Sequence, residues 1–319
     1  MNSKLKSILK ISLPLLLSVA AVWYSFSIIP FDSLVGSFKE ANYSWVILGT
    51  FLGLLSHLSR AYRWRFQLEP MGYNIKLGNS VMAVFATYLI NYTVPRAGEI
   101  ARASILTNYE GVPFEKSFGT IVSERIADMV VMLVIIAVTL FLQYDFIFTK
   151  LSESIAPLKI LIGAIAGLIL IVIIILIIRK AQSKIALKIK SFAMGLVEGI
   201  LSIFKMKKKW PFIFHTLFIW GMYILMFYVT SLSIPEITNI PFAAILIGFI
   251  LASFSIAATN GGIGSYPLAI YAAFSIFNIP EDPSIAFGWI MWTSQTLMII
   301  LFGGFSLFYL PFYNRNHSK

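Results

Sequence analysis

The chain has 319 residues, of which 58% are hydrophobic and 12% are charged, and its mean hydropathy is +0.84. This composition lies well outside the range of a soluble globular domain and predicts an integral membrane protein. We interpret the net charge of +11 as a record of membrane topology, which argues against nucleic-acid binding, and the lack of cysteine excludes disulfides, thiol catalysis and thiolate metal sites.

Apolar segments of the kind that cross a bilayer recur along the chain. They lie near residues 11–29, 45–64, 77–94, 118–142, 157–178, 210–232, 241–258, 264–278 and 284–310. Basic clusters occur at the N-terminus, around 60–76, in 179–209 and at the C-terminus, and the positive-inside rule places all four in the cytoplasm. We therefore predict that both termini are cytoplasmic and that 179–209 is an amphipathic linker lying on the anionic leaflet.

Two breaks containing glycine and proline interrupt this pattern. The first reads P-R-A-G-E at 95–99 and leads into a polar half-helix, and the second reads N-G-G-I-G at 260–264 with Pro267 just beyond. Broken backbone at membrane depth is tolerated only where it is buried in protein or lines a wet cavity. We interpret the breaks as the tips of two re-entrant hairpins, the first opening to the cytoplasm and the second outward. The alternative is a packing kink in each of two ordinary helices.

The order of elements is then helix, helix, hairpin, helix, twice over, in 11–142 and 157–310 with opposite orientation. We predict an all-α polytopic membrane protein that forms a single membrane domain over 1–319. It would contain six full transmembrane helices and two oppositely oriented re-entrant helical hairpins, related as inverted-topology repeats. Paired interruptions in two inverted halves are a sequence pointer to the midplane binding site of a transporter.

The densest polar signal is N-Y-T-V-P-R-A-G-E-I-A-R, which begins at Asn91. It spaces Arg96, Glu99 and Arg102 three residues apart on the half-helix, so that neighbouring pairs can meet on one face. A charge at bilayer depth costs at least ~2.5–3.5 kcal/mol, so these groups require partners. One carboxylate cannot neutralise two guanidiniums, and arginine binds phosphate bidentately, which favours a site for an anionic head group. The alternative is a salt-bridged hinge that holds the hairpin shut.

The next helix opens with S-E-R-I-A-D at 123–128. Glu124 and Asp128 are four residues apart, and Arg125 precedes Asp128 by three, a spacing at which the two side chains can pair. The two acids could also pair with the arginines of the first hairpin. They are therefore candidates either for proton coupling or for simple charge compensation.

The second hairpin carries no charge at its tip. Asn260, Gly261 and Gly262 supply backbone amides, flexible dihedral angles and one side-chain amide, and we include them among the candidate substrate-binding residues. Close helix packing is the alternative explanation for the glycines.

Three arginines lie where the second helix meets the cytoplasmic interface. We interpret Arg63 and Arg65 as snorkelling cations, and Arg60, one turn deeper, as a weaker site candidate. No cofactor and no metal site is predicted, because the histidines are scattered along the sequence; they are His57, His215 and His317.

With these residues in hand, the chain resembles the flippase-like family that includes the transmembrane part of lysylphosphatidylglycerol synthase. The motifs that carry the resemblance are R-A-Y-R-W-R at 60–65, the stretches 91–102 and 123–128 quoted above, and N-G-G-I-G at 260–264. The resemblance implies a protein of the bacterial cytoplasmic membrane that moves lipids between leaflets. It also implies that six charged residues lie in a polar centre, namely Arg96, Glu99, Arg102, Glu124, Arg125 and Asp128.

We therefore predict a lipid transporter for an anionic phospholipid or a polyprenyl-phosphate-linked lipid, in which the charged hairpin binds the head group. The chain ends at Lys319 without the soluble aminoacyl-transfer domain of bifunctional members, so we do not expect it to aminoacylate lipids. Two alternatives stay open. One is a membrane-embedded transferase or phosphatase acting on lipid phosphates, and the other is a non-catalytic partner of a glycosyltransferase.

Overall fold

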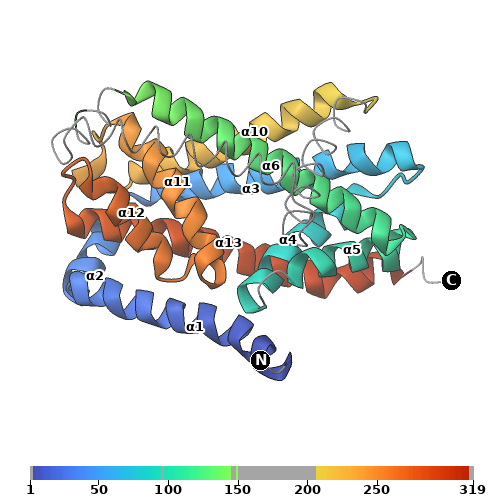
Figure 1. The fold of residues 1–319 in the computed structure, drawn as a ribbon, viewed down its shortest axis with the longest axis horizontal. Helices are drawn as coiled ribbons and strands as arrows, with labels where there is room; N and C mark the ends of the chain where they lie inside the picture. Colours follow the sequence, from blue (N-terminus) through green and yellow to red (C-terminus); the bar gives the residue numbers. More distant parts are fainter. Residues whose placement is uncertain (1–2, 95–96, 145–148, 150–205, 316–319) are drawn as a thin grey trace, which may run out of the picture. The chain divides into compact units, whose positions relative to one another are not determined.

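A computed structural model of the protein describes residues 3–94, 97–144, 149 and 206–315 (Figure 1). Within these residues the chain is helical and contains no strand. The α-helices are α1 (Ser3–Ile28), α2 (Phe31–Glu40), α3 (Tyr43–Leu68), α4 (Leu77–Thr93), α5 (Ala97–Glu110), α6 (Phe114–Leu142), α10 (Lys209–Ser231), α11 (Phe242–Ala258), α12 (Ser265–Ser275) and α13 (Glu281–Tyr313).

The predicted segments inside the described residues all coincide with helices, and the predicted span 157–178 lies outside them, as does nearly all of the linker 179–209. Among the described helices, α6, α10 and α13 are each long and apolar enough to cross a bilayer. A fourth span results if α1, from Leu15, and α2 are counted together as one broken helix bent by 85°.

Helix α2 is not among the elements predicted from the sequence. Pro30 precedes it, and because proline lacks a backbone N–H and clashes with a preceding helical turn, it ends α1 and starts a new helix. The following helix, α3, begins at an Asn42 cap whose side chain accepts a hydrogen bond from the Ser44 amide at 3.1 Å.

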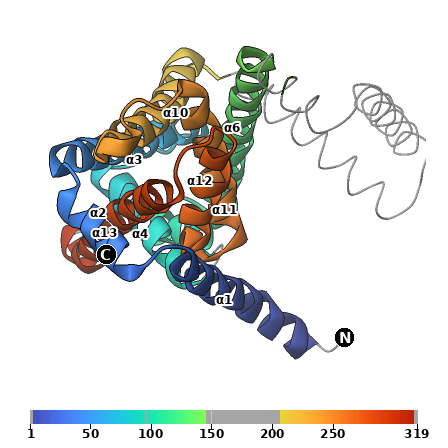
Figure 2. The same cartoon turned by 90° about the vertical axis from the view of Figure 1, so that its left-hand side faces the viewer.

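The chain divides into two compact units, residues 1–124 together with 210–319, and residues 125–209. Both predicted hairpins lie in the first unit. Helices α4 and α5 pack against each other across the break near 95 (Figure 1), and α11 and α12 do so across a short 3₁₀ turn, Asn260–Gly262 (Figure 2). The first helix of each pair has 17 residues, which is short for a full span.

The first hairpin is closed by one glycine. The Gly98 amide donates to Asn91 Oδ1 at 2.8 Å, and a Cβ built on Gly98 would collide with the carbonyl oxygen of Thr87. Only a residue without a side chain lets α5 approach α4 this closely.

The tip of the second hairpin reaches the C-terminal end of α4. Gly261 has a φ of +62°, a left-handed conformation, and a Cβ there would collide with the Tyr92 ring. Trp292 of α13 donates from Nε1 to the Gly261 carbonyl oxygen at 2.8 Å. The two predicted breaks are therefore brought together through Tyr92.

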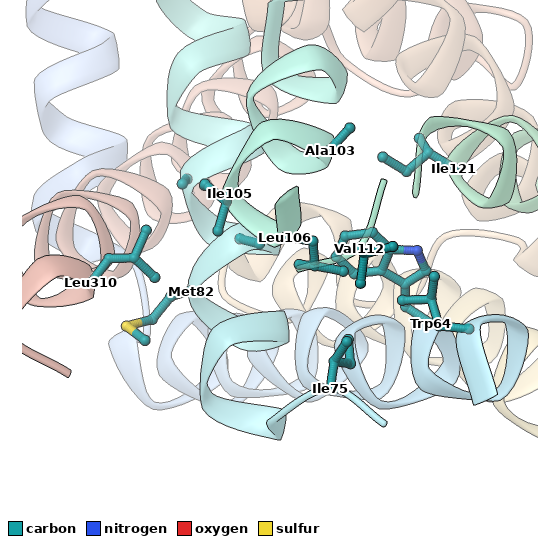
Figure 3. Close-up of a cluster of buried hydrophobic side chains, with 12 residues drawn as sticks. Trp64, Ile75, Met82, Ala103, Ile105, Leu106, Val112, Ile121 and Leu310 are labelled. Atoms are coloured by element: carbon teal, nitrogen blue, oxygen red, sulfur yellow. The ribbon is translucent and has the colours of Figure 1, made fainter. Parts of the chain in front are cut away.

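An apolar cluster holds α3, α4, α5 and the start of α6 together, with Leu310 contributed by α13 (Figure 3). Trp64 is its largest member and is fully buried, and Leu106 and Val112 lie close to it in the figure. The other buried members are Leu68, Ile75, Met82, Ala83, Ala86, Ala103, Ile105, Ile121 and Leu310. This cluster fixes the positions of the helices that carry the charged residues.

Candidate functional site

The centre of the site is an ion pair between α5 and α6. Arg102 Nη1 lies 2.7 Å from Glu124 Oε2, and Arg102 Nη2 lies 3.4 Å from Glu124 Oε1. Both side chains are 1% exposed. This bidentate arrangement is the strongest that arginine forms with a carboxylate, and it ties the first hairpin to the following helix.

A second arginine, Arg63 of α3, approaches the same carboxylate. Its Nη2 lies 4.0 Å from Glu124 Oε2, and its Nη1 donates to Thr216 Oγ1 of α10 at 2.8 Å. The guanidinium lies over the Phe212 ring, 5.1 Å from its centroid. The interpretation of Arg63 as a snorkelling cation is wrong, because its side chain is 0% exposed and is held by Glu124 of α6 and by Thr216 and Phe212 of α10.

Arg60 lies one turn from Arg63 on α3 and is also buried. It acts electrostatically on Glu124 and donates a hydrogen bond to the Tyr223 hydroxyl of α10. We call Arg60, Arg63, Arg102 and Glu124 the arginine cluster. Three formal positive charges and one negative charge meet within it.

Aromatic rings make up part of the walls of the arginine cluster. The Arg102 guanidinium lies 3.8 Å from the centroid of the Trp64 ring, a distance at which a cation–π interaction is favourable. Trp64 is held in place by a hydrogen bond from Nε1 to Thr120 Oγ1 at 2.8 Å. Arg102 is therefore positioned by a carboxylate in its plane and by an indole against its face.

The remaining charged residues predicted for the site occupy different positions. Arg125 and Asp128 form the predicted pair, with Nη1 and Oδ2 3.9 Å apart; Asp128 is buried and Arg125 is 41% exposed. Glu99 is partly buried, and its Oε2 lies 3.5 Å from Asn91 Nδ2. Arg96 lies outside the described residues.

Within the part of the chain that the structure describes, the polar residues of the hairpin tips form contacts with residues near the tips and not with the arginine cluster. Asn91 bonds the Gly98 amide, while Gly261 contacts Tyr92 and Trp292 as described above. Gly262 is buried with a φ of +79°, and Asn260 is partly buried. These tips meet at the C-terminal end of α4, whereas the arginine cluster is built from α3, α5 and α6.

The part of the site that α10 contributes was not predicted from the sequence. Thr216, Phe212 and Tyr223 show no motif, since a threonine or aromatic residue in an apolar span is ordinary. The sequence did indicate a polar face on α3, because His57, Arg60 and Arg63 are spaced three residues apart and so lie on one side of the helix. Arginines that only reach the membrane surface would not need to share one side of the helix.

The described residues contain no group of three or more side chains suited to hold a metal ion. The family model for the lysylphosphatidylglycerol synthase TM region matches residues 11–304. The chain is also 26% identical over 309 residues to UPF0104 membrane protein MJ1595 of Methanocaldococcus jannaschii, with 88% of each chain covered. No solved structure matches it. The chain therefore belongs to the family of the lysylphosphatidylglycerol synthase TM region and is a multi-pass membrane protein.

Proposed function

We propose that this protein moves an anionic phospholipid or a polyprenyl-phosphate-linked lipid between the leaflets of a bacterial cytoplasmic membrane. The observation that carries the proposal is the buried convergence of Arg60, Arg63 and Arg102 on one carboxylate, Glu124. Burying charge in a membrane protein is costly, so such groups are retained where they serve a ligand or ion path. Membership in a family named for a lipid-modifying enzyme supports a lipid ligand.

The Arg102–Glu124 pair suggests how a head group would bind. A phosphate offers the same two-oxygen edge to a guanidinium as a carboxylate does, so it can replace Glu124 as the bidentate partner of Arg102. The replacement releases the tie between α5 and α6. Because Arg102 and Glu124 are closed to solvent here, entry of the head group requires the hairpin of α4 and α5 to move.

The proposed topology follows the charge pattern. Both termini and the basic linker lie in the cytoplasm, and the hairpins of α4–α5 and α11–α12 enter the membrane from opposite sides within an inverted repeat. The contact between Tyr92 and Gly261 supports this arrangement, because two re-entrant tips of opposite orientation meet near the midplane.

Leaflet exchange in reconstituted vesicles tests the proposal. Arg102→Lys and Arg63→Lys retain the positive charge but lose the planar fork that binds phosphate, and we expect each to slow exchange of an acyl-labelled anionic lipid about tenfold. Arg65→Lys is the matched control on α3. Arg65 is half-buried, lies outside the arginine cluster and donates an exposed hydrogen bond to Asn74 Oδ1, so this variant should transport like the parent protein.

Two results would contradict the proposal. One is exchange at the parent rate in both cluster variants at equal reconstitution. The other is a parent protein that exchanges anionic lipid no faster than protein-free vesicles do.

A further inference from the structure

Polar side chains continue from the arginine cluster along the buried face of α3 toward the tips of the hairpins. From Arg63 to Gly53, α3 rises about 15 Å, which is about half of the hydrocarbon thickness. Polar side chains of α3 and of the helices that face it line this stretch. We call them the polar seam; they are Ser56 and His57 of α3, Tyr88 and Tyr92 of α4, Tyr223 of α10 and Gln295 of α13.

Direct contacts connect the half of the polar seam that adjoins the arginine cluster. The Tyr223 hydroxyl is hydrogen-bonded to Ser56 and Tyr88 as well as to Arg60. The His57 ring lies 4.5 Å from the Tyr88 ring, centroid to centroid. This half of the seam is therefore continuous with the arginine cluster through Arg60.

The other half leads to the second hairpin. Gln295 Oε1 lies 2.6 Å from the position of a Cβ on Gly53, so the glutamine side chain lies directly against α3. On the next residue of α13, Thr296 Oγ1 lies 3.2 Å from the Tyr92 hydroxyl. The Tyr92 ring in turn contacts Gly261, so this half of the seam ends at the tip of the second hairpin.

Two side chains in the polar seam each have a polar atom that could form a hydrogen bond with a ligand. His57 Nδ1 and Gln295 Nε2 are buried, and neither has a hydrogen-bond partner among the residues that the structure describes. His57 is 7% exposed. A buried polar atom left without a hydrogen bond costs roughly 1–3 kcal/mol, which favours a site that is completed by a bound group.

The polar seam contains no acidic or basic side chain other than His57, and formal charges adjoin it at the arginine cluster. The stretches 77–94, 210–231 and 283–314, which form most of α4, α10 and α13, contain no Asp, Glu, Lys or Arg. These helices therefore offer neutral donors and acceptors, which suit hydroxyl groups. An ammonium group placed beside them would gain no carboxylate from these three helices and would be repelled by Arg60.

We propose that the polar seam is a second subsite that binds the uncharged hydroxyls of a head group whose phosphate occupies the arginine cluster. The transported lipid then has an anionic, hydroxylated head group without an amine. Two sources share this chemistry, a glycerol-bearing phospholipid and a sugar-bearing polyprenyl phosphate. The inference rests on the proposed transport function and narrows its substrate class.

The test compares acyl- or prenyl-labelled lipids in phosphatidylcholine vesicles that contain the full chain. The lipids are phosphatidylglycerol, hexosyl polyprenyl phosphate, phosphatidic acid and phosphatidylethanolamine. We expect one of the two hydroxylated lipids to exchange fastest, which identifies the source, and phosphatidylethanolamine to exchange slowest. Exchange of phosphatidylethanolamine as fast as the hydroxylated lipids overturns the subsite but leaves transport standing, whereas no protein-dependent exchange of any lipid overturns both proposals.

Gln295→Leu and His57→Phe isolate the subsite from the arginine cluster. Each should slow the preferred hydroxylated lipid about threefold to tenfold, the effect of one hydrogen bond, and leave phosphatidic acid at the parent rate. Ser294→Ala is the matched control on α13, because its hydroxyl is bonded within the helix to the Met291 carbonyl. Equal slowing of both lipids in the two seam variants indicates a purely structural role and overturns the subsite.

Discussion

Replacing Glu124 by glutamine should lower the free energy of unfolding by about 3–5 kcal/mol, because the change leaves buried guanidiniums without their shared counter-charge. Arg102 loses a bidentate partner, and Arg63 and Arg60 lose an electrostatic one. Thermal or denaturant unfolding in detergent micelles measures the effect. Arg125→Gln, one residue further along the helix, should cost less than about 1 kcal/mol, because its guanidinium is 41% exposed and 3.9 Å from its acid.

A double-mutant cycle separates the ion pair from general damage to the core. Arg102→Met alone should destabilise strongly, whereas Arg102→Met combined with Glu124→Gln should cost less than the sum of the two single changes. Additive losses would show that the two side chains do not depend on each other, contrary to the 2.7 Å contact between them.

Gly98→Ala should have the second large effect on stability. Its new methyl group would collide with the Thr87 carbonyl oxygen and the Asn91 side chain, and backbone cannot yield as a flexible side chain can. We expect a loss of about 1–3 kcal/mol as α5 separates from α4, together with loss of the Gly98–Asn91 hydrogen bond.

Gly119→Ala provides the comparison for this prediction. Gly119 is also helical, on α6, but nothing lies within 4 Å of a Cβ placed there. The substitution should therefore be neutral or stabilising by up to about 1 kcal/mol, as expected from helix propensity. Equal effects of the two substitutions would mean that the close contact between α4 and α5 does not constrain the first hairpin.

The helices that could be predicted from the sequence are those that contain a long apolar run or end at a break marked by Gly, Pro or Asn. Hydropathy located every described helix that has a long apolar run, and Gly, Pro and Asn marked both breaks. Helix α2 has no such run, because Phe31–Glu40 is short and mixed in polarity. Its start depends on Pro30, which by itself also fits an ordinary loop.

The site could be predicted only as far as single-helix spacing allows. The i,i+3 pair of Arg125 and Asp128 follows from spacing and is confirmed. The suggestion that an acid of the next helix pairs with an arginine of the hairpin is confirmed for Glu124 and Arg102. The approach of Arg63 to the same acid depends on how α3, α6 and α10 pack, and no local pattern in α3 encodes its neighbours.

The stacking of Arg102 on Trp64 also gives the arginine cluster an optical property. Indole emission responds to the charge and polarity next to the ring, and here the nearest charge is a guanidinium 3.8 Å from its centroid. Any event that draws Arg102 away from Glu124 also changes the surroundings of Trp64. The chain has seven tryptophans, so in a variant whose other six are replaced the fluorescence of Trp64 reports on the state of the ion pair without an added label.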